Sequence, residues 1–277
     1  MQIVPLSSAL GAEIRGVDLA QPLDDETFRR IEQAWFEHLI LLIRDQRLDE
    51  EQQARFCARF GTLVASYNAK RETAAGQHPA VMYVSNIREN GKLIGSLPDG
   101  EMHFHSDQCH TEQPAMATML YAMEIPSQGG DTLFANMYQA YETLAPELKS
   151  KLEGLKAENV YDYNAESLMR RGSKIREGVQ HCAHPVFRMH PVTRRKALYV
   201  NRLMTDHIVG LPAGESETIL LRLFDHAEQP GMVYTHRWRV GDLILWDNRC
   251  TQHARTDFDA SERRKLRRIT VRGERPF

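Results

Sequence analysis

The amino-acid sequence predicts a mixed, β-rich fold with a jelly-roll-like core of short strands and flanking α-helices. Two observations lead to this prediction. Short apolar or alternating runs recur along most of the chain, separated by turn residues such as glycine and proline. Helical periodicity is confined to the N-terminal region and to later insertions, so strands and helices do not alternate regularly as in a doubly wound sheet. Because no internal repeat, low-complexity tract or linker divides the sequence, we expect residues 1–277 to form a single domain.

Two helices are expected in the N-terminal region. The first is predicted by an aspartate cap at Asp24 or Asp25, followed by apolar residues at spacings of three and four. These apolar residues are Phe28, Ile31, Trp35 and Leu39. A short buried strand is expected at 39–43, and a second helix begins after Asp49 and is stopped by Gly61.

The rest of the chain begins with a polar segment, 66–100, which is rich in glycine and other loop residues. A long loop immediately before a candidate metal motif is a suitable place for a substrate lid, although a plain surface connection fits equally well. A mainly helical stretch is expected at 136–155 with a break near Pro146, and another helix at 215–228. The strands are expected at 117–123, 184–187, 197–200, 232–239, 242–246 and 266–272.

Composition excludes several classes of protein. With 42% hydrophobic residues, 26% charged residues and a formal net charge of −2, the chain resembles an ordinary globular protein, and no nucleic-acid partner is expected. No apolar run reaches the roughly 18 residues of a membrane span, so no membrane partner is expected. The N-terminus lacks a charged segment followed by an apolar one, which favours the cytoplasm. Four scattered cysteines without a CxxC pair predict reduced thiols rather than disulfides or a zinc site.

The motif Phe104-His105-Ser106-Asp107 carries the first chemical signal. At a strand end, residues i and i+2 face the same side, so His105 and Asp107 can reach one ion. A remote His253 would complete the 2-His-1-carboxylate set that holds non-haem Fe(II). The spacing alone is weak evidence for a metal site, because a single His-x-Asp motif is common in proteins. A histidine-rich, cupin-like site that uses His103 or His110 is an open alternative.

A run of cations, 263–268, follows His253. Strand alternation places Arg264, Leu266 and Arg268 on one face and the other three cations on the opposite face. Two arginines on a core-facing surface need anionic partners, because unpaired buried charge is costly. Bound carboxylate-like groups could be these partners. In the alternative interpretation, all these cations are exposed to solvent on an edge strand and need no bound anion.

At this point the sequence resembles the taurine and aryloxyalkanoate (TauD/TfdA) group of Fe(II)/2-oxoglutarate-dependent dioxygenases. The resemblance extends over nearly the whole chain. It rests on Leu10-Gly11-Ala12-Glu13-Ile14, Gly16-Val17-Asp18-Leu19, Phe104-His105-Ser106-Asp107, Gly129-Gly130-Asp131-Thr132, His184-Pro185-Val186, His190-Pro191-Val192, Trp246-Asp247-Asn248-Arg249, His253, Arg264 and Arg268.

The resemblance implies a double-stranded β-helix and assigns roles to individual residues. His105, Asp107 and His253 would be the iron ligands and the catalytic centre. Thr132 and Arg264 would bind the distal carboxylate of the cosubstrate 2-oxoglutarate, and Arg268 would engage an anionic group of the substrate. Arginine suits such a carboxylate because its planar fork can bond both oxygens. The expected cofactors are therefore Fe(II), 2-oxoglutarate and O2, and the resemblance implies a homo-oligomer, either a dimer or a tetramer.

Two departures from the family pattern concern the substrate. Where taurine-type members carry a histidine for the sulfonate, this chain continues from Phe60-Gly61-Thr62-Leu63 to Ser66, and Glu101 replaces an asparagine. We therefore expect Arg268, Glu101, Ser66 and Asn86 to contact the substrate. The predicted function is hydroxylation of a small anionic compound, with release of succinate and CO2. Candidate substrates are aryloxyalkanoates, sulfonates, sulfate esters and amino-acid-like compounds, with cleavage of a C–heteroatom bond where the hydroxylated carbon carries a heteroatom.

Two other classes of function compete with this oxidoreductase. A metal-dependent hydrolase would need a general base beside a metal-bound water and would have no use for Arg264. A non-catalytic cupin-like binding protein would not need His105, Asp107, His253 and Arg264 to be retained together.

Overall fold

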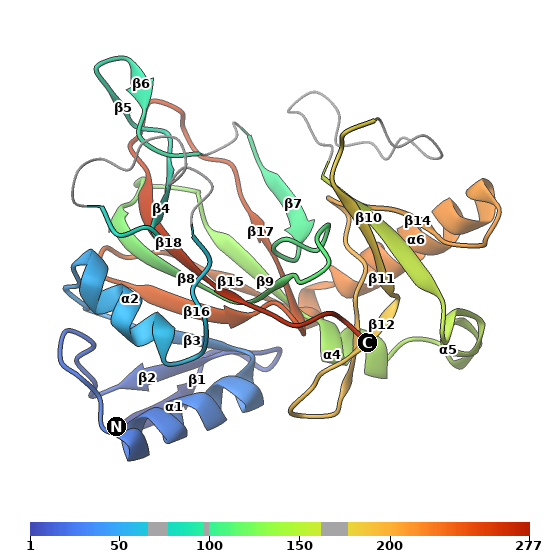
Figure 1. Ribbon diagram of the computed structural model, residues 1–277, viewed down its shortest axis with the longest axis horizontal. Helices are drawn as coiled ribbons and strands as arrows, with labels where there is room; N and C mark the ends of the chain where they lie inside the picture. Colours follow the sequence, from blue (N-terminus) through green and yellow to red (C-terminus); the bar gives the residue numbers. More distant parts are fainter. Residues whose placement is uncertain (66–76, 97–99, 162–176) are drawn as a thin grey trace.

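The computed structural model describes residues 1–65, 77–96, 100–161 and 177–277 (Figure 1). Two larger, mainly antiparallel sheets dominate the described chain. The seven-stranded sheet has the order β1 (Gln2–Pro5), β2 (Ala12–Arg15), β3 (Ile40–Ile43), β16 (Leu243–Asp247), β8 (Ala115–Glu124), β18 (Lys265–Arg272) and β4 (Met82–Ser85), with only the β2–β3 pair parallel. The four-stranded sheet has the order β15 (Val233–His236), β9 (Thr132–Asn136), β17 (Thr251–Arg255) and β7 (Met102–His105).

Smaller strand groups and the helices surround these sheets. A three-stranded sheet joins β11 (His181–Pro185), β10 (Lys156–Val160) and β14 (Thr205–Ile208). Two hairpins are β12 (Phe187–Met189) with β13 (Lys196–Leu198), and β5 (Arg88–Glu89) with β6 (Lys92–Leu93). The helices are α1 (Asp25–His38), α2 (Glu50–Ala58), α4 (Met137–Glu142), α5 (Pro146–Leu152), α6 (Ala213–Ala227) and the 3-10 turn η1 (Pro230–Met232). In Figure 1, α1 and α2 lie on one side of the molecule and α5 and α6 on the other, with α4 between them.

The N-terminal helices form where their capping residues predict them. The Asp24 side chain accepts a hydrogen bond from the backbone of Thr27, and α1 buries Phe28, Ile31 and Trp35. Asp49 and Gln52 form a reciprocal capping box at the start of α2. This second helix ends at Ala58, earlier than the predicted stop at Gly61.

Two hydrophobic clusters hold these elements together. One lies between α1, α2 and the outer face of the seven-stranded sheet, and includes Trp35, Phe56 and Ile269. The other joins the inner faces of the two larger sheets with α4, α5 and α6. Within it, the rings of Phe134 on β9 and Trp246 on β16 lie 5.6 Å apart between centroids. The mixed, β-rich prediction is thereby confirmed, and the space between the two inner faces is where the candidate site forms.

Several details differ from the sequence prediction. The break at Pro146 is present, because α4 ends at Glu142 and α5 begins at Pro146. The expected strand at 184–187 is divided between β11 and β12, and the one at 197–200 ends at Leu198. Sequence reasoning missed nine of the described strands, because they are very short or because their polar or mixed residues do not alternate cleanly. Six of them are β1, β2, β9, β10, β14 and β17, and the other three, β4, β5 and β6, lie in the segment 66–100 that was predicted to be a loop.

Strand β18 has the two faces that alternation predicts. Leu266 belongs to the inner cluster and Arg268 points to the same side, where it contacts Asp107. On the opposite face Arg267 is only 3% exposed. Its guanidinium donates to Gln53 on α2 and to the carbonyl of Leu48. The opposite face is therefore partly buried under α2 rather than a solvated run of cations.

Candidate metal and cosubstrate site

His105, Asp107 and His253 come together between the two larger sheets. His105 is the last residue of β7 and pairs directly with His253 on β17. Asp107 lies in the turn after β7, so it reaches the histidines from a turn and not from the strand itself. One potential ligand atom from each residue lies within 4.8 Å of the others, and His253 Nε2 is 3.9 Å from Asp107 Oδ1. Two imidazoles and one carboxylate are the donor set that holds non-haem Fe(II).

The hydrogen bonds and charges of these three residues fit a cation. His105 Nδ1 faces the carbonyl oxygen of His103 at 2.9 Å, so Nδ1 carries the proton and Nε2 keeps a lone pair. Burial lowers the pKa of both histidines, and burial together with neighbouring His105 lowers that of His253 to about 3. Burial alone would raise the pKa of Asp107, but the charge of Arg268 and the hydrogen bond from Thr118 lower it, and the carboxylate stays ionised. Both imidazoles are thus neutral and the carboxylate is charged.

Arg268 lies directly beside this cluster. Its Nη2 is 2.6 Å from Asp107 Oδ1, and its side chain is 21% exposed. Arg268 is therefore at the edge of the cluster, with its charge directed at the same oxygen that faces His253.

Arg264 is a buried cation that lacks its full set of partners. It immediately precedes β18, is 1% exposed, and donates from Nη2 to the carbonyl of Gly130 at 3.1 Å. Within the described chain, its Nε and Nη1 have no hydrogen-bond partner. Burial and the nearby charge of Arg255 lower its pKa to about 9. A carboxylate would satisfy both free donors and the charge.

Thr132 begins β9, two residues after the Gly130 carbonyl that Arg264 contacts. Its Oγ1 accepts a hydrogen bond of 3.0 Å from Trp238 Nε1. Because the indole can only donate, the Thr132 hydroxyl proton is left to donate elsewhere. The hydroxyl can therefore serve a carboxylate held by Arg264.

The remaining predicted substrate contacts differ in their surroundings. Ser66 lies outside the described residues. Glu101 is exposed and directly precedes β7. Asn86 accepts from the backbone of Arg264 at 2.9 Å and donates to the carbonyl of Glu262 at 2.8 Å. The Asn86 amide thus stabilises the backbone around Arg264. The contacts of Asn86 and Glu101 with a substrate stay predictions.

The competing histidines have other neighbours. His103 contributes its carbonyl to His105, as described above. His110 packs its ring against Tyr161 with centroids 4.5 Å apart, and burial lowers its pKa to about 4. In the described ranges, neither histidine belongs to a group that could hold a metal ion.

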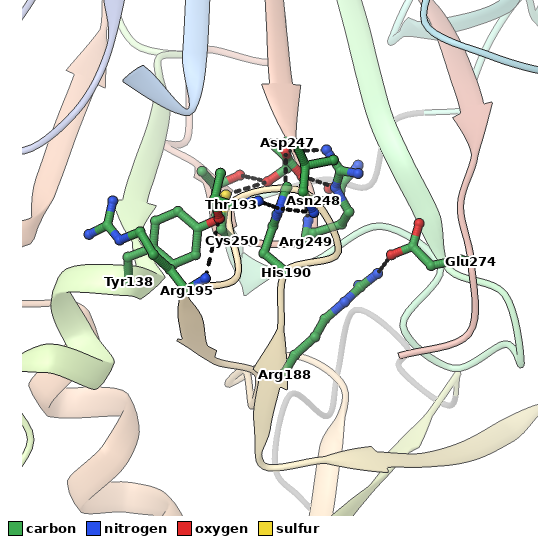
Figure 2. Close-up of polar contacts among 12 residues, drawn as sticks. Tyr138, Arg188, His190, Thr193, Arg195, Asp247, Asn248, Arg249, Cys250 and Glu274 are labelled. Carbon is green, nitrogen blue, oxygen red and sulfur yellow. Dashed lines mark hydrogen bonds and ion pairs between the residues drawn. The ribbon is translucent and has the colours of Figure 1, made fainter. Parts of the chain in front are cut away.

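A second group, His190, Asp247 and Cys250, also brings potential ligand atoms together (Figure 2). His190 Nδ1 accepts from the backbone of Thr193 at 3.1 Å, so the proton is on Nε2, which donates to Asp247 Oδ2 at 3.1 Å. Arg249 binds both Asp247 oxygens, at 2.8 and 2.7 Å. Burial raises the pKa of the Cys250 thiol well above its usual value. These groups use one another as hydrogen-bond and ion-pair partners. The cluster therefore stabilises the turn after β16 and does not offer free metal ligands.

Comparison with known proteins places this geometry in a family. Residues 2–270 match the model of the family described as "Taurine catabolism dioxygenase TauD, TfdA family". The alpha-ketoglutarate-dependent 2,4-dichlorophenoxyacetate dioxygenase of Cupriavidus pinatubonensis is 34% identical over 96% of this chain and 96% of that protein. The alpha-ketoglutarate-dependent sulfate ester dioxygenase of Pseudomonas putida is 31% identical over 100% of this chain and 91% of that protein.

Solved structures agree with the sequence comparison. The structure of AAD-2 in complex with Mn(II) and N-oxalylglycine has a TM-score of 0.84 and 32% identity, and the match covers 99% of both chains. A taurine dioxygenase from Burkholderia xenovorans has a TM-score of 0.83 and 31% identity, covering 99% of this chain and 90% of that one. The family predicted from the sequence motifs is thereby confirmed, and the chain belongs to the taurine catabolism dioxygenase TauD, TfdA family.

Proposed function

We propose that this protein is an Fe(II)/2-oxoglutarate-dependent dioxygenase that hydroxylates a small anionic organic compound. The observation that carries the proposal is the convergence of His105, Asp107 and His253 beside Arg268, together with a buried Arg264 that has free donors. Fe(II), when bound, supplies O2 activation coupled to conversion of 2-oxoglutarate into succinate and CO2. A metal hydrolase would leave the buried Arg264 without a use.

The chain's own residues bind and orient the cosubstrate. His105 and His253 present neutral imidazoles, and Asp107 adds one negative charge to the metal site. Arg264 receives the distal carboxylate of 2-oxoglutarate on its free Nε and Nη1 donors, and the Thr132 hydroxyl donates a further hydrogen bond. Because the guanidinium is already desolvated, the ion pair gains strength that an exposed arginine could not provide.

Arg268 supports the choice of an anionic substrate. Its guanidinium contacts Asp107 Oδ1. When Asp107 serves as a metal ligand, Arg268 needs a different anion, and a substrate carboxylate, sulfonate or sulfate would provide one. The names of the relatives, which include 2,4-dichlorophenoxyacetate, (S)-phenoxypropionate and sulfate ester dioxygenases, favour aryloxyalkanoates and sulfate esters. Hydroxylation at a carbon that carries oxygen would then lead to C–O cleavage.

We also propose a double-stranded β-helix and a single domain. The two facing antiparallel sheets favour a double-stranded β-helix, and two clusters that share one sheet favour a single domain over 1–277. A homo-oligomer, dimer or tetramer, and a cytoplasmic location stay predictions. Among the described helices, none combines the length and apolar character needed to cross a bilayer.

The proposal is tested by adding Fe(II) and 2-oxoglutarate to the protein without oxygen. We expect a weak visible charge-transfer band, followed by succinate formation when oxygen is admitted. A panel of aryloxyalkanoates, sulfonates, alkyl sulfates and amino acids should then contain compounds that accelerate succinate release. Absence of both the band and succinate would refute the proposal, and hydrolysis of panel compounds without oxygen would favour the hydrolase.

A further inference from the structure

The two oxygens of Asp107 have different surroundings. Oδ1 faces the candidate metal position, 3.9 Å from His253 Nε2, and is contacted by Arg268. Oδ2 accepts a hydrogen bond of 2.6 Å from the hydroxyl of Thr118 on β8. Oδ1 therefore faces His253 and Arg268, whereas Oδ2 is held by the Thr118 hydroxyl.

The direction of the Thr118 hydroxyl is imposed by its neighbours. The indole Nε1 of Trp246 and the backbone N–H of Asp107 both point at Asn248 Oδ1, at 2.9 and 3.2 Å. Since both groups can only donate, this atom of Asn248 is the amide oxygen. Asn248 Nδ2 then donates to Thr118 Oγ1 at 3.0 Å, which leaves the Thr118 proton for Asp107.

This chain of donors closes on itself and is rigidly supported. It runs from Trp246 through Asn248 and Thr118 to the Asp107 carboxylate, and returns through the Asp107 backbone. Thr118 and Asn248 are 0% exposed and Trp246 is 1% exposed, so water does not compete for these bonds. Trp246 and Thr118 are also paired across β16 and β8 in the seven-stranded sheet.

We propose that Thr118 is a positioning residue that keeps Asp107 a one-oxygen ligand. A carboxylate can bind a cation through one or both oxygens. If Asp107 turned to use both, it would take a position that 2-oxoglutarate or O2 needs, because the three-ligand set works by leaving positions open. The hydrogen bond to Oδ2 opposes that rotation. This inference rests on the proposed function and assigns to β8 and β16 a part in cosubstrate binding.

The test replaces Thr118 with Val, which keeps the branched shape and deletes the hydroxyl, and with Ser, which keeps the hydroxyl. Mn(II) affinity and 2-oxoglutarate affinity of the Mn(II)-saturated protein are measured separately, by electron paramagnetic resonance and calorimetry. For Thr118→Val we expect Mn(II) binding as tight as in the wild type or tighter, and 2-oxoglutarate binding weakened about tenfold, the effect of losing one charge-assisted hydrogen bond. Thr118→Ser should restore the wild-type value for 2-oxoglutarate.

A matched control is Thr270→Val, the same change on β18 directly opposite Thr118. It should alter neither affinity. If Thr118→Val does not fold, Trp246→Phe removes the outermost donor and should weaken 2-oxoglutarate in the same sense. Unchanged 2-oxoglutarate binding in a folded Thr118→Val protein, or loss of Mn(II) binding instead, would overturn the inference, as would a failure of Ser to rescue. If the wild type itself binds no Mn(II) and makes no succinate with Fe(II), the proposed function fails rather than this inference alone.

Discussion

The guanidinium of Arg268 and the carboxylate of Asp107 are in direct contact, with Arg268 Nη2 2.6 Å from Asp107 Oδ1. The oxygen that a metal ion would use is thus already neutralised by a cation of the protein itself. Arg268 and a metal ion would compete for the negative charge of Asp107. An anionic substrate would give Arg268 another partner and would leave the Asp107 carboxylate to the metal ion.

Replacing Arg268 with Gln should therefore separate metal binding from substrate binding. A charge-assisted hydrogen bond is worth about 1.5 kcal/mol, so we expect Mn(II) to bind up to about tenfold more tightly when this competitor is removed. The KM of the accelerating panel compound should rise by at least about tenfold. Titration with Mn(II) and steady-state succinate assays measure the two effects. Arg263→Gln, which removes an exposed ion pair with Glu124, is the control and should change neither value. Weaker Mn(II) binding in Arg268→Gln would contradict the competition.

The depressed pKa of His253 predicts how stability depends on pH. The pKa of His253 is about 3 in the folded protein and 6.5 ordinarily. Between these pH values the imidazole is protonated in the unfolded chain but not in the folded one. The stabilisation is complete above pH 6.5 and is lost as the pH falls towards about 3. Thermal unfolding of the metal-free protein should show Tm falling across this window. In His253→Asn the fall should be shallower, and an equal slope in both proteins would argue against a buried neutral imidazole.

The buried charge of Arg264 should destabilise the folded protein when 2-oxoglutarate is not bound, and binding of the cosubstrate should remove that destabilisation. Its desolvated charge, with a pKa lowered to about 9 by burial and by Arg255, lacks two hydrogen-bond partners in the described structure. Arg264→Met should raise the Tm of the protein without 2-oxoglutarate. The same change should weaken 2-oxoglutarate binding by about a hundredfold, which corresponds to the roughly 3 kcal/mol upper range of a charged hydrogen bond. A lower Tm in the absence of cosubstrate would show that the cation is stabilising as it stands.

Gly130 should be sensitive to the addition of a single methyl group. Its φ is +65°, and a Cβ would lie 3.1 Å from Arg264 Nε, so Gly130→Ala combines backbone strain with displacement of the guanidinium. We expect a loss of stability of about 1–2 kcal/mol and a higher 2-oxoglutarate KM. Gly91→Ala is a matched control, because Gly91 also has a positive φ, +77°, but a Cβ there would meet nothing within 4 Å. The control should lose stability without any change in KM. Equal KM values for the two variants would contradict the predicted displacement.

Much of the site was accessible from residue types and short-range spacing. His105 and Asp107 are two residues apart, so any strand end or turn brings them near one another. The alternation of β18 correctly separated Arg264 and Arg268 from Arg267, because strand periodicity is a local property. The burial of Arg267 could not be foreseen, since it depends on α2 and on carbonyl groups distant in the chain.

The sequence by itself identified the residue types that the structure brings together at the candidate site: two histidines, one carboxylate, and arginines on an inward face. Only the tertiary structure decided which donor and acceptor atoms at the site already have hydrogen-bond partners and which do not. The pairing of His253 with His105 requires the register between β17 and β7, and β17 was not predicted, because its polar residues face a site and not solvent. In the sequence, Thr118 and Trp238 fall within predicted strands, at 117–123 and 232–239, and look like ordinary strand residues. Their hydrogen bonds to Asp107 and Thr132 exist only because long-range strand pairing buries these groups together, where each donor must find an acceptor.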